Sequence, residues 1–220
     1  MRFSPESAFR RMASGRMRRV CLLAGAGADS SALAWELLSR GFEVHPLYVR
    51  CGFRWERAEL FCLRRLLRRL ARPGLKPLTV MAAPMNGALA GHWSLSGRAV
   101  PDARSAADSV YLPGRNLILL SQAGVLCGLK GLPAIATAVL RGNPFADARP
   151  AAFAAMSRAI SLAVDRRVEV FAPYLRLSKE RVLARTPGLP LELTFSCLNP
   201  RGLRACGDCN KCAERALVVS

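Results

Sequence analysis

Residues 20–31 read Val-Cys-Leu-Leu-Ala-Gly-Ala-Gly-Ala-Asp-Ser-Ser, and they predict a strand, a glycine-rich turn and the start of a helix. The apolar run is typical of a buried parallel strand. Residues 32–40 then place Leu33, Leu37 and Leu38 on one helical face. Glycines let the backbone approach a phosphate, and the free N–H groups of a helix start point toward it. We therefore expect an anion-binding loop; the alternative is an ordinary strand-to-helix turn in which Asp29 caps the helix.

The rest of the chain continues this alternation of strands and helices. We expect strands at 43–50, 75–82, 133–140 and 168–171, and helices at 56–70, 117–129, 149–165 and from 178. This order predicts an α/β fold, a doubly wound, mostly parallel five-stranded sheet. Such sheets bind ligands at the carboxyl ends of their strands, so the segments that follow the strands share one rim. Residues 83–110 show little periodicity and predict a long loop or lid.

Length and charge restrict the class of protein. The 220 residues suit one domain with a sizeable core, and the formal net charge of +18 comes almost entirely from arginine. A basic surface can hold nucleic acid or nucleotides, although biased codon usage gives the same excess. Sparse aromatic residues argue against a stacking platform for single strands, so tRNA or DNA is the less favoured partner. Because no apolar run reaches the roughly 18 residues of a membrane span, and residues 1–19 lack a signal-peptide core, we predict a cytoplasmic protein. A homodimer is one oligomeric state left open.

The cysteines fall into two groups. Four are scattered in apolar surroundings and predict small buried side chains, whereas four crowd into the tail at Cys197, Cys206, Cys209 and Cys212. Four thiolates at these spacings can close a tetrahedron around Zn²⁺ and leave no open position, so the site would be structural. A 4Fe–4S cluster and unliganded thiols are the alternatives. We therefore expect a disordered basic arm at 1–19, an α/β domain at 20–190 and a metal-binding tail at 191–220.

Several motifs resemble a known family. Residues 25–30 resemble the Ser-Gly-Gly-x-Asp-Ser loop of the ATP pyrophosphatase (PP-loop) superfamily. Residues 194–215 resemble the zinc tail of the 7-cyano-7-deazaguanine synthases, PP-loop enzymes of queuosine biosynthesis. Pro-Gly-Arg-Asn at 113–116, Asp-x-Arg-Pro at 147–150 and the late Lys-Glu at 179–180 are similar to further segments of that family, in its order.

The departures from the family pattern are also specific. The leading serine of the loop is Gly25 and its first glycine is Ala26, so one phosphate donor is lost and ATP should bind more weakly than in relatives that keep it. The family's Tyr-Gly-Gln-Arg-His becomes Cys-Gly-Phe-Arg-Trp at 51–55. Its acidic and aromatic residues after the fourth strand become Arg-Gly-Asn-Pro at 141–144. We therefore expect a diverged member.

The resemblance implies an ATP-dependent carbon–nitrogen ligase that adenylates the carboxylate of 7-carboxy-7-deazaguanine and, with ammonia, converts it to the nitrile. It implies ATP, Mg²⁺ and structural Zn²⁺. The residues implied to hold ATP are Ala24, Gly25, Ala26, Gly27, Ala28, Asp29, Ser30 and Ser31. The implied catalytic residues are Asp29, Ser30, Arg115 and Lys179, and the implied substrate contacts are Arg115, Asn116 and Asp147. For Arg115 and Asn116 the alternative is a helix-start pair, and for Lys179 an exposed first-turn lysine.

Three functions remain open from the sequence. The first is the nitrile-forming ligase. The second is a diverged ligase that activates a deazapurine or similar acid for another acceptor. The third is a non-catalytic nucleotide- or tRNA-binding protein on a decayed scaffold. Pyrophosphate release separates the first two from the third, and the mass of the product separates the first from the second.

Overall fold

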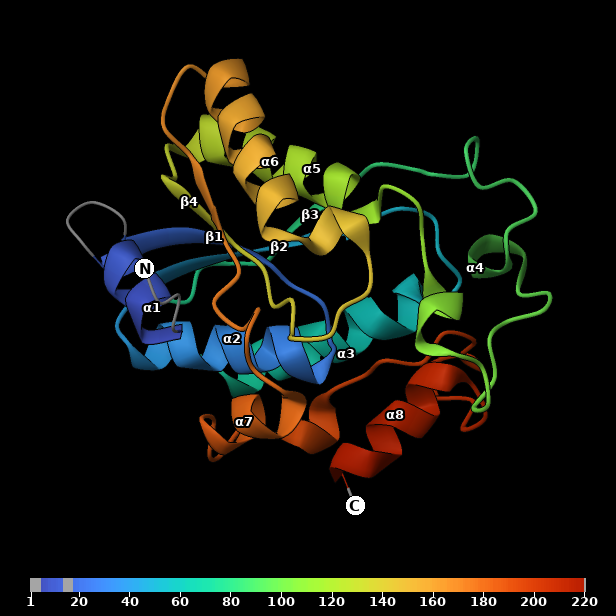
Figure 1. Cartoon of the computed structure of the whole chain (residues 1–220). Coiled ribbons are helices and arrows are strands. Elements are labelled where there is room, and N and C mark those ends of the chain that lie inside the picture. Colours follow the sequence, from blue (N-terminus) through green and yellow to red (C-terminus); the bar gives the residue numbers. More distant parts are fainter. Residues whose placement is uncertain (1–4, 14–17, 220) are drawn as a thin grey trace.

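Five parallel strands form the centre of the molecule (Figure 1). The computed structural model describes residues 5–13 and 18–219. The strand order is β3-β2-β1-β4-β5, and every neighbouring pair is parallel. The predicted doubly wound parallel sheet is therefore confirmed. The strands are β1 (Arg19–Leu23), β2 (Glu43–Arg50), β3 (Thr79–Ala82), β4 (Ala134–Ala136) and β5 (Glu169–Phe171).

Helices cover both faces of the sheet. In Figure 1, α2 and α3 lie on one side of the strands and α5 and α6 on the other, while α7 and α8 lie beyond α2 and α3. This three-layer arrangement buries the apolar strands on both faces. The helices are α1 (Pro5–Ala13), α2 (Ala28–Ser39), α3 (Glu56–Arg69), α4 (Trp93–Ser96), α5 (Arg115–Lys130), α6 (Pro150–Ala163), α7 (Lys179–Ala184) and α8 (Asn210–Val219).

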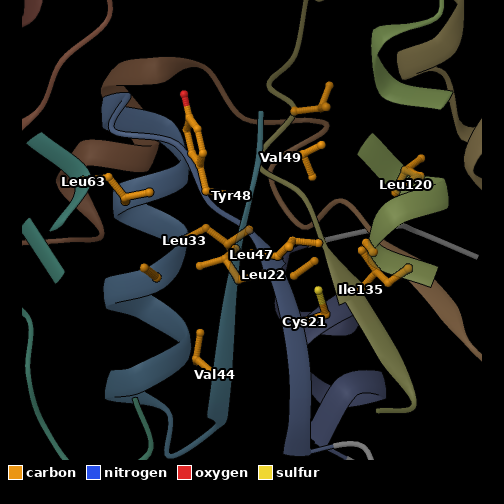
Figure 2. Close-up of a cluster of buried hydrophobic side chains, with 14 of the residues drawn as sticks. Cys21, Leu22, Leu33, Val44, Leu47, Tyr48, Val49, Leu63, Leu120 and Ile135 are labelled. Carbon is orange, nitrogen blue, oxygen red and sulfur yellow. The ribbon is translucent and has the colours of Figure 1, made fainter. Parts of the chain in front are cut away.

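The core lies where the helices meet the central strands. Figure 2 shows Leu33 of α2 directed toward Leu22 and Leu47 of β1 and β2, with Leu120 of α5 on the opposite side near Ile135. All five of these side chains are at most 1% exposed. Their burial holds β1 in the centre of the sheet. The loop that follows β1 therefore begins at the carboxyl edge of the sheet, next to β2 and β4.

The helix α5 departs from its predicted environment. The apolar run at 117–129 suggested a buried helix, but Leu117, Val125 and Leu129 are 54%, 47% and 79% exposed. The opposite face, with Leu120, is buried against the sheet and α6. The helix is covered on one side only, so these three apolar side chains face outward.

Residues 5–13 correct the prediction of a disordered arm. They form α1, where Phe9 and Met12 are almost completely buried. Glu6 pairs with Arg40, which follows α2, and with Arg185, which follows α7. The two apolar side chains, spaced three residues apart, supply the burial that composition alone did not reveal. Residues 1–4 and 14–17 lie outside the described part of the chain.

The C-terminal tail returns to the loop that follows β1. The Phe195 N–H donates to the Ala26 carbonyl at 2.7 Å, and residues 208–210 pair with residues 101–103. Phe195, Cys197 and Leu198 belong to the same apolar core as the sheet. The division at residue 190 stays a prediction, and α8 was not foreseen. Among the described helices, none is long and apolar enough to cross a membrane.

Candidate active site

A cavity of about 530 Å³ opens at the carboxyl ends of the strands. It lies where the chain order of the sheet reverses, between β1 and β4, which is the usual ligand position in doubly wound folds. Its walls come from the loop after β1, the starts of α3 and α5, the segment after β4 and the first turn of α8. The segments after β1, β2 and β4 therefore share one space, as predicted for the rim, whereas residues 173–179 after β5 do not line it.

The loop after β1 is closed by serine side chains. The Ser30 hydroxyl donates toward the Gly25 and Gly27 carbonyls at 2.9 and 3.2 Å, and Ser31 bonds the Gly27 carbonyl at 2.7 Å. Gly27 is the N-cap residue of α2, so the alternative of Asp29 as a helix cap is wrong. Of the predicted ATP residues, Ala24, Gly25, Gly27, Asp29 and Ser30 line the cavity, whereas Ala26, Ala28 and Ser31 do not.

Asp29 lies in the first turn of α2 and faces a cluster of charges. Its Oδ1 atom is buried and lacks a hydrogen-bond partner among the described residues. Lys179 Nζ lies 3.9 Å away, an ion-pair distance that is too long for a hydrogen bond. Burial raises the pKa of Asp29, and the Lys179 charge opposes that rise. The orphaned oxygen is suited to a cation.

Glu59 was not predicted from the sequence, yet it reaches the loop. Its Oε1 atom accepts from the Ala26 N–H at 3.3 Å, and its Oε2 atom accepts from the Tyr48 hydroxyl at 2.8 Å. Burial raises the pKa of Glu59, and the positive charge of Arg115 opposes this rise. Glu59 lies in the first turn of α3, which begins just after the rim segment that follows β2. An acidic residue at the start of a helix that follows the rim is the sequence signal that could have identified it.

Arg115 begins α5 inside the cavity. Gly114 precedes it with φ +68°, a left-handed conformation that glycine adopts without strain. The Arg115 Nε atom is buried without a partner among the described residues, and its guanidinium lies 5.9 Å from the centre of the Phe53 ring. A buried cation with an unused donor is suited to bind an anion.

Asn116 and Asp147 bond to each other. The Asn116 backbone N–H and Nδ2 donate to the two carboxylate oxygens of Asp147 at 3.0 and 3.1 Å. Both residues line the cavity. The pair ties the start of α5 to the segment after β4, as the helix-start alternative expects, and direct substrate contact stays a prediction.

Aromatic rings form a further wall that the sequence did not predict. Phe53 stacks on Trp55 with centroids 4.8 Å apart, and Phe145 packs against Tyr111 at 5.0 Å. Phe53, Trp55 and Phe145 line the cavity. Flat apolar rings beside polar groups are suited to hold a heteroaromatic base.

The four tail cysteines converge as predicted. All four Sγ atoms lie within 4.8 Å of one another. A single tetrahedral ion with Zn–S bonds of about 2.3 Å requires neighbouring sulfurs to be roughly 3.8 Å apart. Cys206 Sγ lies 3.4 Å from that of Cys197 and 3.9 Å from that of Cys212. A 4Fe–4S cluster would bind each sulfur through a different iron and hold them farther apart, so the geometry favours one ion.

The backbone supports this group of sulfurs. The Cys206 N–H points at Cys197 Sγ from 3.2 Å, and the Leu198 N–H points at Cys209 Sγ from 3.4 Å. Such contacts orient thiolates and stabilise their charge. The residues present therefore fit a metal ion.

The fold and the site together define a PP-loop type of α/β protein, with a glycine-containing loop at the switch point and a tail whose four cysteines could hold a metal ion. The sequence profile of the queuosine biosynthesis protein QueC family matches residues 18–218. The chain belongs to this family.

Its relatives include proteins named 7-cyano-7-deazaguanine synthase. That of Methanoculleus marisnigri is 31% identical over 209 residues, covering 90% of this chain and 91% of its own. That of Hahella chejuensis is 35% identical over 210 residues, covering 90% and 86%. A solved structure of a 4-thiouridine synthetase with RNA and bound ATP covers 90% of this chain and 49% of its own, at 17% identity and a TM-score of 0.50. This last likeness supports the fold alone.

Proposed function

We propose that the protein is an ATP-dependent carbon–nitrogen ligase that converts 7-carboxy-7-deazaguanine to 7-cyano-7-deazaguanine with ammonia. The observation that carries this proposal is a single cavity that joins the loop after β1, Asp29 and the unpartnered guanidinium of Arg115. Membership of the family and the names of its relatives support 7-cyano-7-deazaguanine as the product.

The proposed chemistry consumes two molecules of ATP. A carboxylate oxygen of the acid attacks the α-phosphorus of ATP and pyrophosphate leaves, giving an acyl-adenylate. Ammonia displaces AMP to form the amide. The amide oxygen is then adenylated in the same way, and loss of AMP and two protons gives the nitrile. No protein nucleophile is required, so the chain has to position two ligands and stabilise developing charge.

Each predicted residue then has a role. The N–H groups of the loop and Ser30 hold phosphate oxygens, and Arg115 stabilises the charge that develops on the leaving pyrophosphate. Lys179 does not line the cavity but lies beside Asp29, and in this proposal it contacts the phosphates from that edge. The orphaned Asp29 Oδ1 is suited to bind Mg²⁺ that accompanies ATP.

Zinc is the ion that we propose for the four cysteines. A closed set of four thiolates leaves no position for water, so the ion would stabilise the tail and take no part in the reaction. A cytoplasmic location and a homodimer stay predictions, and nucleic acid is not part of the proposal.

A second candidate is adenylation of a different acid. Arg141 and Asn143 line the cavity where the family carries acidic and aromatic residues. A guanidinium recognises an anionic group better than the edge of a purine. The mass of the product formed from 7-carboxy-7-deazaguanine separates the two candidates.

Pyrophosphate release tests the proposal. We expect release that depends on ATP, Mg²⁺ and the acid, with the nitrile as the final product in the presence of ammonia. Arg115→Ala should lower the rate at least about a hundredfold, since it removes one electrostatic contact to the transition state. Arg68→Ala, which removes an exposed arginine of α3, is the matched control and should leave the rate unchanged.

Two outcomes would contradict the proposal. Wild-type protein that binds ATP but releases no pyrophosphate with this acid excludes the nitrile-forming reaction. Equal rates for Arg115→Ala and wild type, with both proteins folded by circular dichroism, exclude Arg115 from the reaction.

A further inference from the structure

The metal-binding tail forms part of the wall of the cavity. Lys211, in the first turn of α8, and Glu214, one turn further along the helix, line the same space as Asp29 and Ser30. Two-thirds of the Lys211 side chain is covered, since its relative exposure is 33%. Lys211 is therefore held at the cavity and does not extend freely into solvent.

Four charges meet at this wall. Glu214 binds Lys179 through Oε1 and Lys211 through Oε2. Asp29 lies beyond Lys179, with its Oδ1 atom unpartnered. Lys179 thus lies between Asp29 and Glu214, and Lys211 binds the other oxygen of Glu214, so two ammonium groups with three donors each lie near the loop after β1. An ammonium group can keep one carboxylate and still bind a phosphate oxygen.

The position of Lys211 depends on the cysteines on either side of it. Cys209 and Cys212 belong to the metal-binding group, and the Cys212 N–H donates to the Cys209 carbonyl at 2.9 Å. An ion bound to both thiolates fixes the backbone between them. Lys211, the residue before Cys212, then emerges from a rigid turn toward the cavity.

We propose that Lys211 is a phosphate-binding residue supplied by the tail, and that metal binding and ATP binding are thereby coupled. This inference rests on the proposed ATP site. The bound ion positions Lys211, which binds the polyphosphate of ATP opposite the loop after β1. Coupling between two ligands is reciprocal, so ATP must strengthen metal binding by the same factor.

Calorimetry on metal-loaded protein tests the role of Lys211. Lys211→Met should weaken binding of MgATP and of inorganic pyrophosphate about tenfold, the scale of one charge-assisted contact. AMP affinity should stay within about twofold, because AMP lacks the phosphates concerned. Lys211→Arg should retain most of the affinity. Lys130→Met removes an exposed lysine at the end of α5 and should bind ATP like wild type.

Competition with a zinc chelator at equilibrium tests the coupling. Saturating ATP should raise the zinc affinity of wild type several-fold and leave that of Lys211→Met unchanged. Equal ATP affinity in Lys211→Met and wild type overturns the inference and leaves the proposed function intact. A similar loss in Lys130→Met also overturns it, because net charge would then explain the effect. Absence of ATP binding in wild type overturns the proposed function as well.

Discussion

At the scale of single residues, the Glu59 carboxylate occupies the space that a side chain at Gly25 would need. A Cβ atom on Gly25 would lie 2.8 Å from Glu59 Oε1, closer than such atoms approach. Glu59 cannot easily retreat, because Tyr48 and the Ala26 N–H both bind its carboxylate. The absence of a side chain at Gly25 and the position of the Glu59 carboxylate are therefore structurally linked in this chain.

Gly25→Ser tests this pairing. The motif alone suggests that a restored serine adds a phosphate donor and tightens ATP binding. The geometry predicts the opposite: weaker ATP binding, and a free energy of unfolding lower by about 1–3 kcal/mol, the usual cost of overpacking. Unfolding by urea at fixed metal concentration and calorimetry with ATP measure the two effects.

Glu59→Ala supplies the matched background for that test. Without the carboxylate, Gly25→Ser should cost clearly less, and the difference is the coupling energy of the pair. The same cost in both backgrounds would show that Glu59 is not the obstacle.

Sequence reasoning identified residues that belong to motifs and missed those that reach the site from elsewhere. Asp29, Ser30 and Arg115 lie in short sequence motifs that contain glycine, so their positions follow from local chain geometry. Glu59 and Lys211 lie on helices whose orientation depends on packing against the sheet and on the metal-binding group. Such placement is a tertiary property that local sequence does not encode.

At the scale of elements, the Glu43 side chain connects β1, β2 and the segment that precedes β3. It begins β2, bonds Arg19 of β1 at 2.9 Å and His45 at 2.8 Å, and pairs with Lys76, which precedes β3, at 3.1 Å. The bonds to His45 and then to Arg19 lower the pKa of Glu43 to about 2. Because this value is below the ordinary 4.5, the carboxylate stabilises the fold above pH 4.5 and loses that effect as the pH falls toward 2.

Glu43→Gln should therefore lower the melting temperature at neutral pH and narrow the gap to wild type as the pH falls from 4.5 toward 2. Thermal melts over this range measure the difference. Glu192→Gln, an exposed site without an ion pair in the described structure, is the control for loss of one charge. A gap that stays constant with pH would contradict the assigned role of Glu43.

The bounds of an element could be predicted where its apolar pattern runs from the first residue of the element to the last. The strand at 43–50 was predicted with its observed bounds, and α3 within one residue. The strands β3 and β4 are shorter than predicted: β3 begins four residues later, after an isolated bridge at Leu75, and β4 ends four residues earlier, because regular pairing covers only part of each apolar run. The single buried face of α5 could not be predicted, since a uniformly apolar helix does not show which side the sheet will cover.

At the scale of the whole molecule, the tail and the sheet depend on each other. Phe195 binds the Ala26 carbonyl in the loop, and Lys211 and Glu214 close one side of the cavity. The doubly wound parallel sheet followed from the alternating pattern. The return of the tail to the loop did not, because it joins segments about 170 residues apart through backbone bonds and buried side chains.

Removal of the metal should therefore also impair the proposed nucleotide site. We expect about one zinc per chain by elemental analysis of protein purified without oxygen. Chelation, or Cys209→Ser, should lower the melting temperature as well as the rate of pyrophosphate release, since a tail without a core of its own depends on the ion for its fold.

Cys62→Ser provides the control for this experiment. Cys62 is half-buried on α3 and lies outside the group of four, so this variant should keep its zinc and its melting temperature within a few degrees. Iron with sulfide in the purified protein would contradict the single-ion geometry. A metal-free Cys209→Ser protein with an unchanged melting temperature would show that the tail folds without the ion. In that case the backbone of 197–212 holds the sulfurs together without the ion. Metal binding would then stabilise neither the tail nor the loop after β1.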